Sequence, residues 1–144
     1  MTEPTGEAGD PGAPEARPVL PGTRVLVVED DEFLRDLVEE LLRDAGARAV
    51  SAPDAEAAAA RLEAGVEVDV VLTDLHLPGE SGFWLAEWCE ARAPGLPVVV
   101  MSAALPPGGS VFPRSVRRYV RKPFTPGSLL RAVEEAVRPP GPGR

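Results

Sequence analysis

The sequence lacks the features of a secreted or membrane-bound protein. Its one cysteine, Cys89, excludes an internal disulfide, and a free thiol is normal in a reducing compartment. It has no apolar run near the ~18 residues of a membrane span, and no basic segment followed by an apolar one at its start. We therefore expect a cytoplasmic protein without a membrane partner.

Positive charge is also scarce, since 15 Lys and Arg face 23 Asp and Glu for a formal net charge of -8. Proteins that hold nucleic acid through its phosphates usually carry a basic surface. This argues against a nucleic-acid partner and favours a cation or a basic one. The 144 residues, 44% hydrophobic and 26% charged, are typical of one globular domain.

Proline, glycine, alanine and glutamate dominate both ends of the chain. Residues 1–22, "MTEPTGEAGDPGAPEARPVLPG", show no apolar periodicity, and residues 139–144 have a similar composition. Such segments bury too little apolar surface to order themselves. We predict a disordered tail over 1–22, a folded domain over 23–138 and a flexible tail over 139–144.

Between the tails, strand patterns alternate with helix patterns. Short apolar or β-branched runs predict strands at 24–28, 47–51, 69–73, 97–102 and 117–121. Helix patterns follow, with Asp31, Asp54, Ser81 and Thr125 as expected N-caps. The alternation predicts an α/β fold with a five-stranded parallel sheet and helices on both faces.

In such a sheet, ligands bind beyond the carboxyl ends of the strands. The residues at these ends are Glu29, Asp30, Asp74, Ser102 and Lys122. Clustered carboxylates suit Mg²⁺, and an amine with a hydroxyl suits phosphoryl oxygens. The pattern predicts phosphoryl-transfer chemistry at this edge.

Four segments in order, "VLVVEDD", "VLTDLHLPGESGF", "VVVMSA" and "YVRKPF", make the chain similar to a response-regulator receiver domain of bacterial two-component signalling, of the chemotaxis-response-regulator type. Each motif is weak alone, whereas four at compatible spacing are specific. The resemblance covers about 23–137 and implies a doubly wound, flavodoxin-like sheet with strand order 2-1-3-4-5.

The resemblance also implies roles for site residues. Asp74 would be the phosphoacceptor, served by a histidine kinase, a phosphotransfer protein or a small phosphodonor. Asp30 would bind Mg²⁺ directly, Glu29 mostly through water, and His76 through its backbone carbonyl. The His76 side chain would also affect how water reaches the acyl phosphate.

Lys122 would contact the phosphoryl group. Ser102 and Tyr119 would form the switch: Ser102 would turn towards the phosphoryl group on activation, and Tyr119 would swing inward and couple the site to the outer face. The Lys122-Pro123 peptide would be cis. Asp31 lies outside the motif and is expected to cap the helix after it.

The segment after the fourth strand, "AALPPGGSVFPRSVRR" at 103–118, departs from the family. Interior proline costs a helix about 3 kcal/mol and glycine about 1 kcal/mol relative to alanine. We predict that the fourth helix is short or irregular, which alters the surface that most receivers use for output.

Two features are candidate partner surfaces. Trp84 and Trp88 lie four residues apart on a helix whose other positions can face the sheet, so we expect them on the outer side, either as a partner contact or as packing under the irregular segment. Basic residues near the fifth strand either protect a sheet edge or meet an acidic partner. They are Arg114, Arg117, Arg118 and Arg121.

The leading hypothesis is a stand-alone receiver that is phosphorylated on Asp74 with Mg²⁺ and signals through protein contacts or a phosphorelay. It would not be an enzyme beyond promoting its own phosphoryl transfer and autodephosphorylation. The alternative is a receiver-like binding module that works without phosphorylation, with a remodelled fourth-helix region. An aspartate-nucleophile phosphatase is disfavoured because His76 stands where a second acid is expected.

Overall fold

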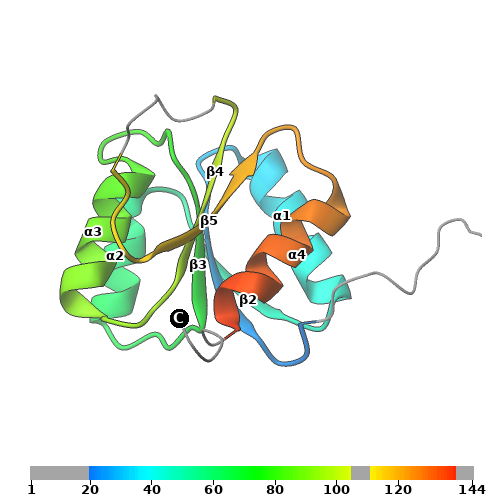
Figure 1. Cartoon of the computed structure of the whole chain (residues 1–144), viewed down its shortest axis with the longest axis horizontal. Coiled ribbons are helices and arrows are strands. Elements are labelled where there is room, and N and C mark those ends of the chain that lie inside the picture. Colours follow the sequence, from blue (N-terminus) through cyan, green and yellow to red (C-terminus); the bar gives the residue numbers. More distant parts are fainter. Residues whose placement is uncertain (1–19, 105–110, 139–144) are drawn as a thin grey trace, which may run out of the picture.

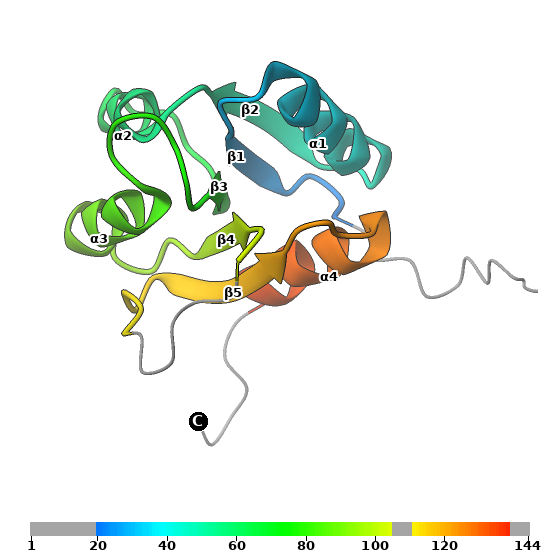
Figure 2. The same cartoon turned by 90° about the horizontal axis from the view of Figure 1, so that it is seen from above.

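The computed structural model describes residues 20–104 and 111–138. In these ranges the chain forms one parallel sheet with the strand order β2-β1-β3-β4-β5, and Figure 2 shows the strands in this order. This confirms the predicted fold class and strand order. The elements are β1 (Arg24–Val28), α1 (Glu32–Asp44), β2 (Arg48–Ala52), α2 (Ala55–Glu63), β3 (Val70–Asp74), α3 (Gly82–Arg92), β4 (Val98–Ser102), β5 (Val116–Arg121) and α4 (Pro126–Val137).

Helices cover both faces of the sheet. Figure 1 shows α2 and α3 on one side and α1 and α4 on the other. Alternate strand residues therefore enter two separate apolar cores, as in β1, where Val25 and Val27 join one core and Leu26 and Val28 the other. Burial on both faces explains why β1, β3 and β4 read as nearly continuous apolar runs, whereas the edge strands β2 and β5 are more polar. Within the described ranges, no helix is long and apolar enough to cross a membrane.

Side-chain caps determine where the helices begin. Asp31, Asp54, Ser81 and Thr125 each precede a helix, and each accepts a hydrogen bond from a backbone N–H in its first turn. Such caps satisfy donors that have no partner within the helix. All four predicted caps are confirmed.

The folded part begins earlier than we predicted. Leu20 is only 1% exposed and packs in the core below α1 and α4. Its N–H donates to the carbonyl of Ala45 at 2.8 Å, and the N–H of Gly22 donates to that of Gly46 at 2.9 Å. Assigning 20–22 to the tail was therefore wrong. Leu20 is a single apolar residue among prolines, and only the folded chain places it against the end of α1. Residues 1–19 and 139–144 lie outside the described residues.

No helix forms in the described residues between β4 and β5, which are 103–104 and 111–115. The second stretch packs on α3 instead. The Phe112 ring lies 5.2 Å from that of Phe83, and the Ser115 hydroxyl donates to the carbonyl of Ala86 at 2.7 Å. These residues agree with the predicted loss of a regular fourth helix, and 105–110 lie outside the described residues.

Candidate functional site

The parallel strands bring the predicted acids to one edge of the sheet. Glu29 and Asp30 follow β1, and Asp74 ends β3 beside it. One carboxylate oxygen from each lies within 4.8 Å of the others. Glu29 and Asp74 are buried whereas Asp30 is exposed, so the cluster opens to solvent on one side.

Lys122 joins the acids from the residue after β5. Its Nζ lies 3.2 Å from Oδ2 of Asp74 and 3.3 Å from Oε1 of Glu29. Burial alone would lower the pKa of Lys122, but the charges of Asp74 and Glu29 outweigh it and raise that pKa. Three carboxylates and one ammonium leave an excess of two negative charges. A divalent cation with hard oxygen ligands fits this donor set.

Glu29 is the most deeply buried of the acids, at 1% exposed. Burial raises the pKa of its carboxyl group, and the charge of Asp74 adds to this, while the Asp31 N–H and Lys122 act in the opposite direction. The fold therefore holds an acid where its ionised form is costly. Such perturbed carboxyl groups cluster at functional sites.

The third acid of the run has a separate task. The Asp31 side chain accepts a hydrogen bond from the N–H of Leu34 at 3.2 Å and caps α1. Its own N–H donates to Oε2 of Glu29 at 3.2 Å. The acidic run therefore contains two site residues and one helix cap.

Ser102 and Tyr119 both form hydrogen bonds with the backbone of Ala104. Ser102 is fully buried, and its Oγ accepts a hydrogen bond from the N–H of Ala104 at 3.2 Å. The hydroxyl of Tyr119 donates to the carbonyl of the same Ala104 at 2.6 Å. The Tyr119 ring stacks on Phe112 with the ring centres 5.8 Å apart. Ala104 thus links the site edge, through Tyr119, to the described residues just before β5.

His76 lies exposed in the β3–α3 connection, two residues after Asp74. The Lys122-Pro123 peptide is cis, as the resemblance implies. The ligand role of the His76 carbonyl stays a prediction.

Two residues at the site were missed by sequence reasoning. Gly82 begins α3, and a Cβ built there would lie 2.4 Å from the carbonyl oxygen of Asp74. Arg35 on α1 donates from Nη1 to the carbonyl of Glu29 at 2.9 Å. Glycine after a cap and arginine on an amphipathic helix are common, so neither carries a signal without the fold.

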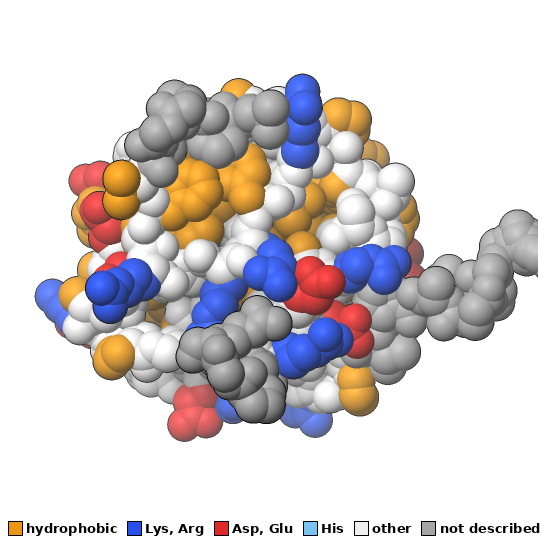
Figure 3. Space-filling view, in the orientation of Figure 1, with side chains coloured by type: hydrophobic (Ala, Val, Ile, Leu, Met, Phe, Trp, Pro, Cys, Tyr) orange, Lys and Arg blue, Asp and Glu red, His pale blue; other side chains and the backbone are white. Residues whose placement is uncertain are grey.

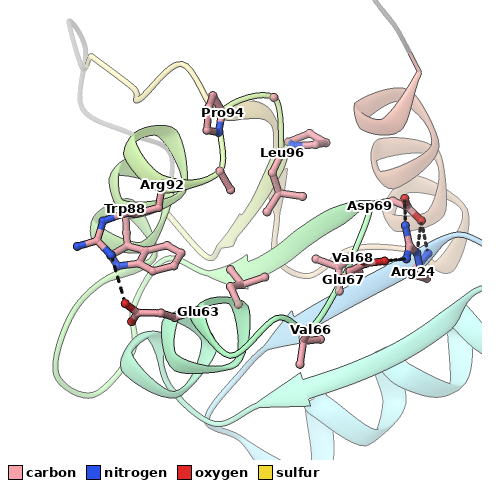
Figure 4. Close-up of a pocket in the computed structure, with 14 residues that line it drawn as sticks. Arg24, Glu63, Val66, Glu67, Val68, Asp69, Trp88, Arg92, Pro94 and Leu96 are labelled. Carbon is pink, nitrogen blue, oxygen red and sulfur yellow. Dashed lines mark hydrogen bonds and ion pairs between the residues drawn. The ribbon is translucent and has the colours of Figure 1, made fainter.

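Trp84 and Trp88 are less exposed than expected of an outer-side pair, and their role as a partner contact stays a prediction. Both are half-buried and pack against the core between the sheet and the α2–α3 side. Trp88 lines a cavity of about 730 Å³, with the guanidinium of Arg92 lying 5.4 Å from its ring centre. Figure 4 shows these two residues at one end of the cavity and Arg24 with Asp69 at the other. The cavity lies at the amino ends of β1, β3 and β4, at the opposite edge from the acids.

The arginines of β5 do not form a uniform basic patch. Arg118 pairs with Glu135 at 3.0 Å, and Arg117 donates to the carbonyl of Ala136 near the end of α4 at 3.1 Å. Arg121 is exposed. Figure 3 shows basic and acidic side chains interspersed over β5 and α4. Two of the three arginines therefore hold α4 to the sheet edge.

The strand order, the two helical layers and the acids with one lysine at the carboxyl edge define the flavodoxin-like α/β class. The model of the response regulator receiver domain family matches residues 25–134. The chain belongs to this family.

Known relatives agree with this assignment. The chain is 35% identical over 119 residues to the sensory transduction protein RegX3 of Mycobacterium bovis, covering 81% of this chain and 51% of that protein. It is 30% identical over 112 residues to the uncharacterized transcriptional regulatory protein YbdJ of Bacillus subtilis, covering 77% of this chain and 49% of that protein. The chain thus spans about half the length of these relatives.

Solved structures show the same fold. A CheY-like receiver domain of Methanospirillum hungatei has a TM-score of 0.74 at 26% identity, covering 81% of this chain and 94% of that one. The response regulator TrrA of Thermotoga maritima, in complex with Mg(2+)-BeF, has a TM-score of 0.73 at 25% identity, covering 79% and 98%.

Proposed function

We propose that this receiver domain is phosphorylated on Asp74 in a Mg²⁺-dependent reaction and changes its protein contacts as a result. The observation that carries the proposal is the convergence of Glu29, Asp30 and Asp74 within 4.8 Å, with Lys122 bonded to two of them. The complex of TrrA with Mg(2+)-BeF supports the same chemistry by similarity.

Mg²⁺ would be held by Asp30, Asp74 and the His76 carbonyl, with Glu29 acting mostly through water. The donor set fits because it is made of oxygen atoms and carries an excess of two negative charges. Bound Mg²⁺ would offset the repulsion among the acids and neutralise charge on phosphoryl oxygens.

In the reaction, a carboxylate oxygen of Asp74 forms a bond to phosphorus as the bond from phosphorus to the donor breaks. With a phosphohistidine donor, the leaving imidazole nitrogen keeps the electron pair and takes a proton from solvent. The ammonium of Lys122 already lies at hydrogen-bond distance from Asp74, so it can shift to a phosphoryl oxygen as the acyl phosphate forms.

Ser102 and Tyr119 would report the modification. The Ser102 hydroxyl, now bonded to the Ala104 N–H, would turn to donate to the phosphoryl group. This would move Ala104, whose carbonyl holds the Tyr119 hydroxyl. Tyr119 would then be released from its present bond, and the stacked Phe112 would move with it. The signal would leave through the segment at 111–116.

The His76 side chain would affect the lifetime of the acyl phosphate, because a side chain beside a reacting centre orders or excludes water. Its exposed position two residues after Asp74 supports this role. Comparing the rate of phosphoryl loss in His76→Ala with that in the parent checks it, and equal rates would remove the role.

The donor would be a histidine kinase or a phosphotransfer protein, and the output a protein contact or a phosphorelay. The relatives named as sensory transduction and transcriptional regulatory proteins support a signalling role. The net charge of -8 over the 144-residue chain argues against direct binding of nucleic acid.

The test is incubation with a small phosphodonor and Mg²⁺, followed by intact-mass measurement. We expect addition of one phosphoryl group to the parent and to Asp36→Asn, a matched change of an exposed aspartate on α1. We expect none in Asp74→Asn. Equal labelling of Asp74→Asn and the parent would refute the assignment of Asp74.

One observation favours the second candidate, a binding module that works without phosphorylation. Residues 112–115 are docked on α3 through Phe112 and Ser115, which fixes a surface beside α3 without any phosphoryl group. Beryllofluoride with Mg²⁺ separates the two functions. NMR shifts at Asp74 and at 111–116 would support the switch, and no shift at either place would support the module.

A further inference from the structure

The side chain of Arg35 reaches from α1 back to the end of β1. The side-chain Nη1 of Arg35 donates to the backbone carbonyl of Glu29 at 2.9 Å, and the backbone N–H of Arg35 donates to the carbonyl of Asp31 at 2.8 Å. Arg35 is therefore bonded to both ends of the three-residue connection that carries the first two acids of the cluster.

The Glu29 carbonyl lies where the backbone ladder of β1 and β2 stops. The last bond there runs from the Glu29 N–H to the carbonyl of Ala52 at 3.2 Å. The chain then turns into α2, whose N-cap is Asp54. Within the described residues, Arg35 is the donor that meets the Glu29 carbonyl, so the side chain replaces the next bond of the ladder.

The connection at 29–31 needs such support because its acids repel one another. Glu29 and Asp30 face Asp74 with an excess of two negative charges over Lys122. The Asp31 N–H holds Oε2 of Glu29 and so fixes the direction of that carboxylate. Loss of the Arg35 bond would let the Glu29 peptide turn and would weaken this arrangement.

We propose that Arg35 is a positioning residue for the metal-binding connection, holding Glu29 and Asp30 in the geometry that binds Mg²⁺ without contacting the ion. The inference rests on the Mg²⁺ site of the proposed function. A planar guanidinium directs its donors rigidly, which suits it to this task better than lysine.

The direction of the change in Mg²⁺ affinity when Arg35 is replaced distinguishes a positioning role from a purely electrostatic one. A positive charge beside a cation site repels the ion, so removing it for charge alone would tighten Mg²⁺ binding. Removing a group that orders the ligands weakens binding, and partners of metal ligands typically contribute roughly 10- to 100-fold in affinity. We therefore expect Arg35→Met to raise the Kd for Mg²⁺ by about tenfold or more.

The experiment is Mg²⁺ titration of the full chain by calorimetry, with Arg35→Met, Arg35→Lys and Arg43→Met beside the parent. Arg43→Met is the matched control, since it removes the same charge from α1 at an exposed residue paired with Glu39 at 3.5 Å. We expect a tenfold or larger loss in Arg35→Met, partial rescue in Arg35→Lys, and parent-like or slightly tighter binding in Arg43→Met.

A metal-free readout is amide hydrogen exchange. Arg35→Met should speed exchange at Asp31, whose N–H is bonded to Glu29, with little change in the strands. If Arg35→Met does not fold, Arg35→Lys is measured in its place. We then expect weaker Mg²⁺ binding and faster exchange at Asp31 in Arg35→Lys than in the parent. Binding and exchange equal to the parent in every Arg35 variant that folds would overturn the role of Arg35 alone. No Mg²⁺ binding by the parent would overturn the metal site of the proposed function and this role with it.

Discussion

Replacing Gly82 by alanine tests whether the first turn of α3 determines the position of the proposed phosphoacceptor. The added Cβ would lie 2.4 Å from the Asp74 carbonyl oxygen and 3.1 Å from Cα of Leu75. Ordinary contact begins at 3.4 Å, so the helix and the end of β3 must separate by about 1 Å. The neighbouring atoms are backbone, which cannot yield by a rotamer change.

The expected cost follows from two opposing effects. Overpacking a well-packed site costs about 1–3 kcal/mol, while alanine in place of glycine favours the helix by up to about 1 kcal/mol. We expect Gly82→Ala to lower the free energy of unfolding by about 1–2 kcal/mol, measured by urea denaturation. Because the displaced atom belongs to Asp74 itself, phosphorylation by a small donor should also slow.

The matched control is Gly127→Ala in the first turn of α4, where a built Cβ meets nothing within 4 Å. We expect this variant to be as stable as the parent or up to about 1 kcal/mol more stable. Equal stability of the two alanine variants, with unchanged phosphorylation of Gly82→Ala, would refute the argument from close approach.

Three further predictions concern ionisable groups. The raised pKa of Glu29 means that its contribution to stability is present at low pH and lost as pH rises through that pKa, so Glu29→Gln should raise the free energy of unfolding at neutral pH without metal. Urea denaturation across pH checks this, and a less stable variant at neutral pH would contradict it. Hydrogen bonds from Arg24 lower the pKa of Asp69 in the folded protein. The ionised Asp69 therefore stabilises the fold above its ordinary pKa, and this stabilisation is lost as pH falls through the lowered pKa. Asp69→Asn should therefore cost about 0.5–1 kcal/mol at neutral pH, a value reduced for solvent screening, and the deficit should shrink in acid. A deficit that does not change with pH would contradict this account. Burial raises the pKa of the Cys89 thiol to about 11, so iodoacetamide should modify it slowly in the native protein and quickly in urea, and equal rates would contradict the burial.

Much of the fold could be predicted from local patterns. The strand of 24–28 and the caps Asp31, Asp54, Ser81 and Thr125 lie where the sequence predicts them. These features depend on neighbouring residues, since a cap bonds within one turn and a buried strand is recognised by its own apolar run.

Contacts between distant residues could not be predicted in this way. Leu20 looked like part of a tail, and Trp88 looked exposed because other residues of α3 seemed sufficient to face the sheet. Leu20 is buried by the end of α1, and Trp88 lies beside the α2–β3 connection. In both cases the partner comes from another element, which periodicity along one segment cannot reveal.

The sequence by itself determined the alternation of strands and helices and the positions of the acids and Lys122 at strand ends. From these, parallel strand geometry leads to one chemical edge, because the carboxyl ends of parallel strands lie together. Only the tertiary structure decided how that edge is held. The approach of Gly82 to the Asp74 backbone and the bond from Arg35 to the Glu29 carbonyl join elements through main-chain atoms, and main-chain atoms are the same at every residue.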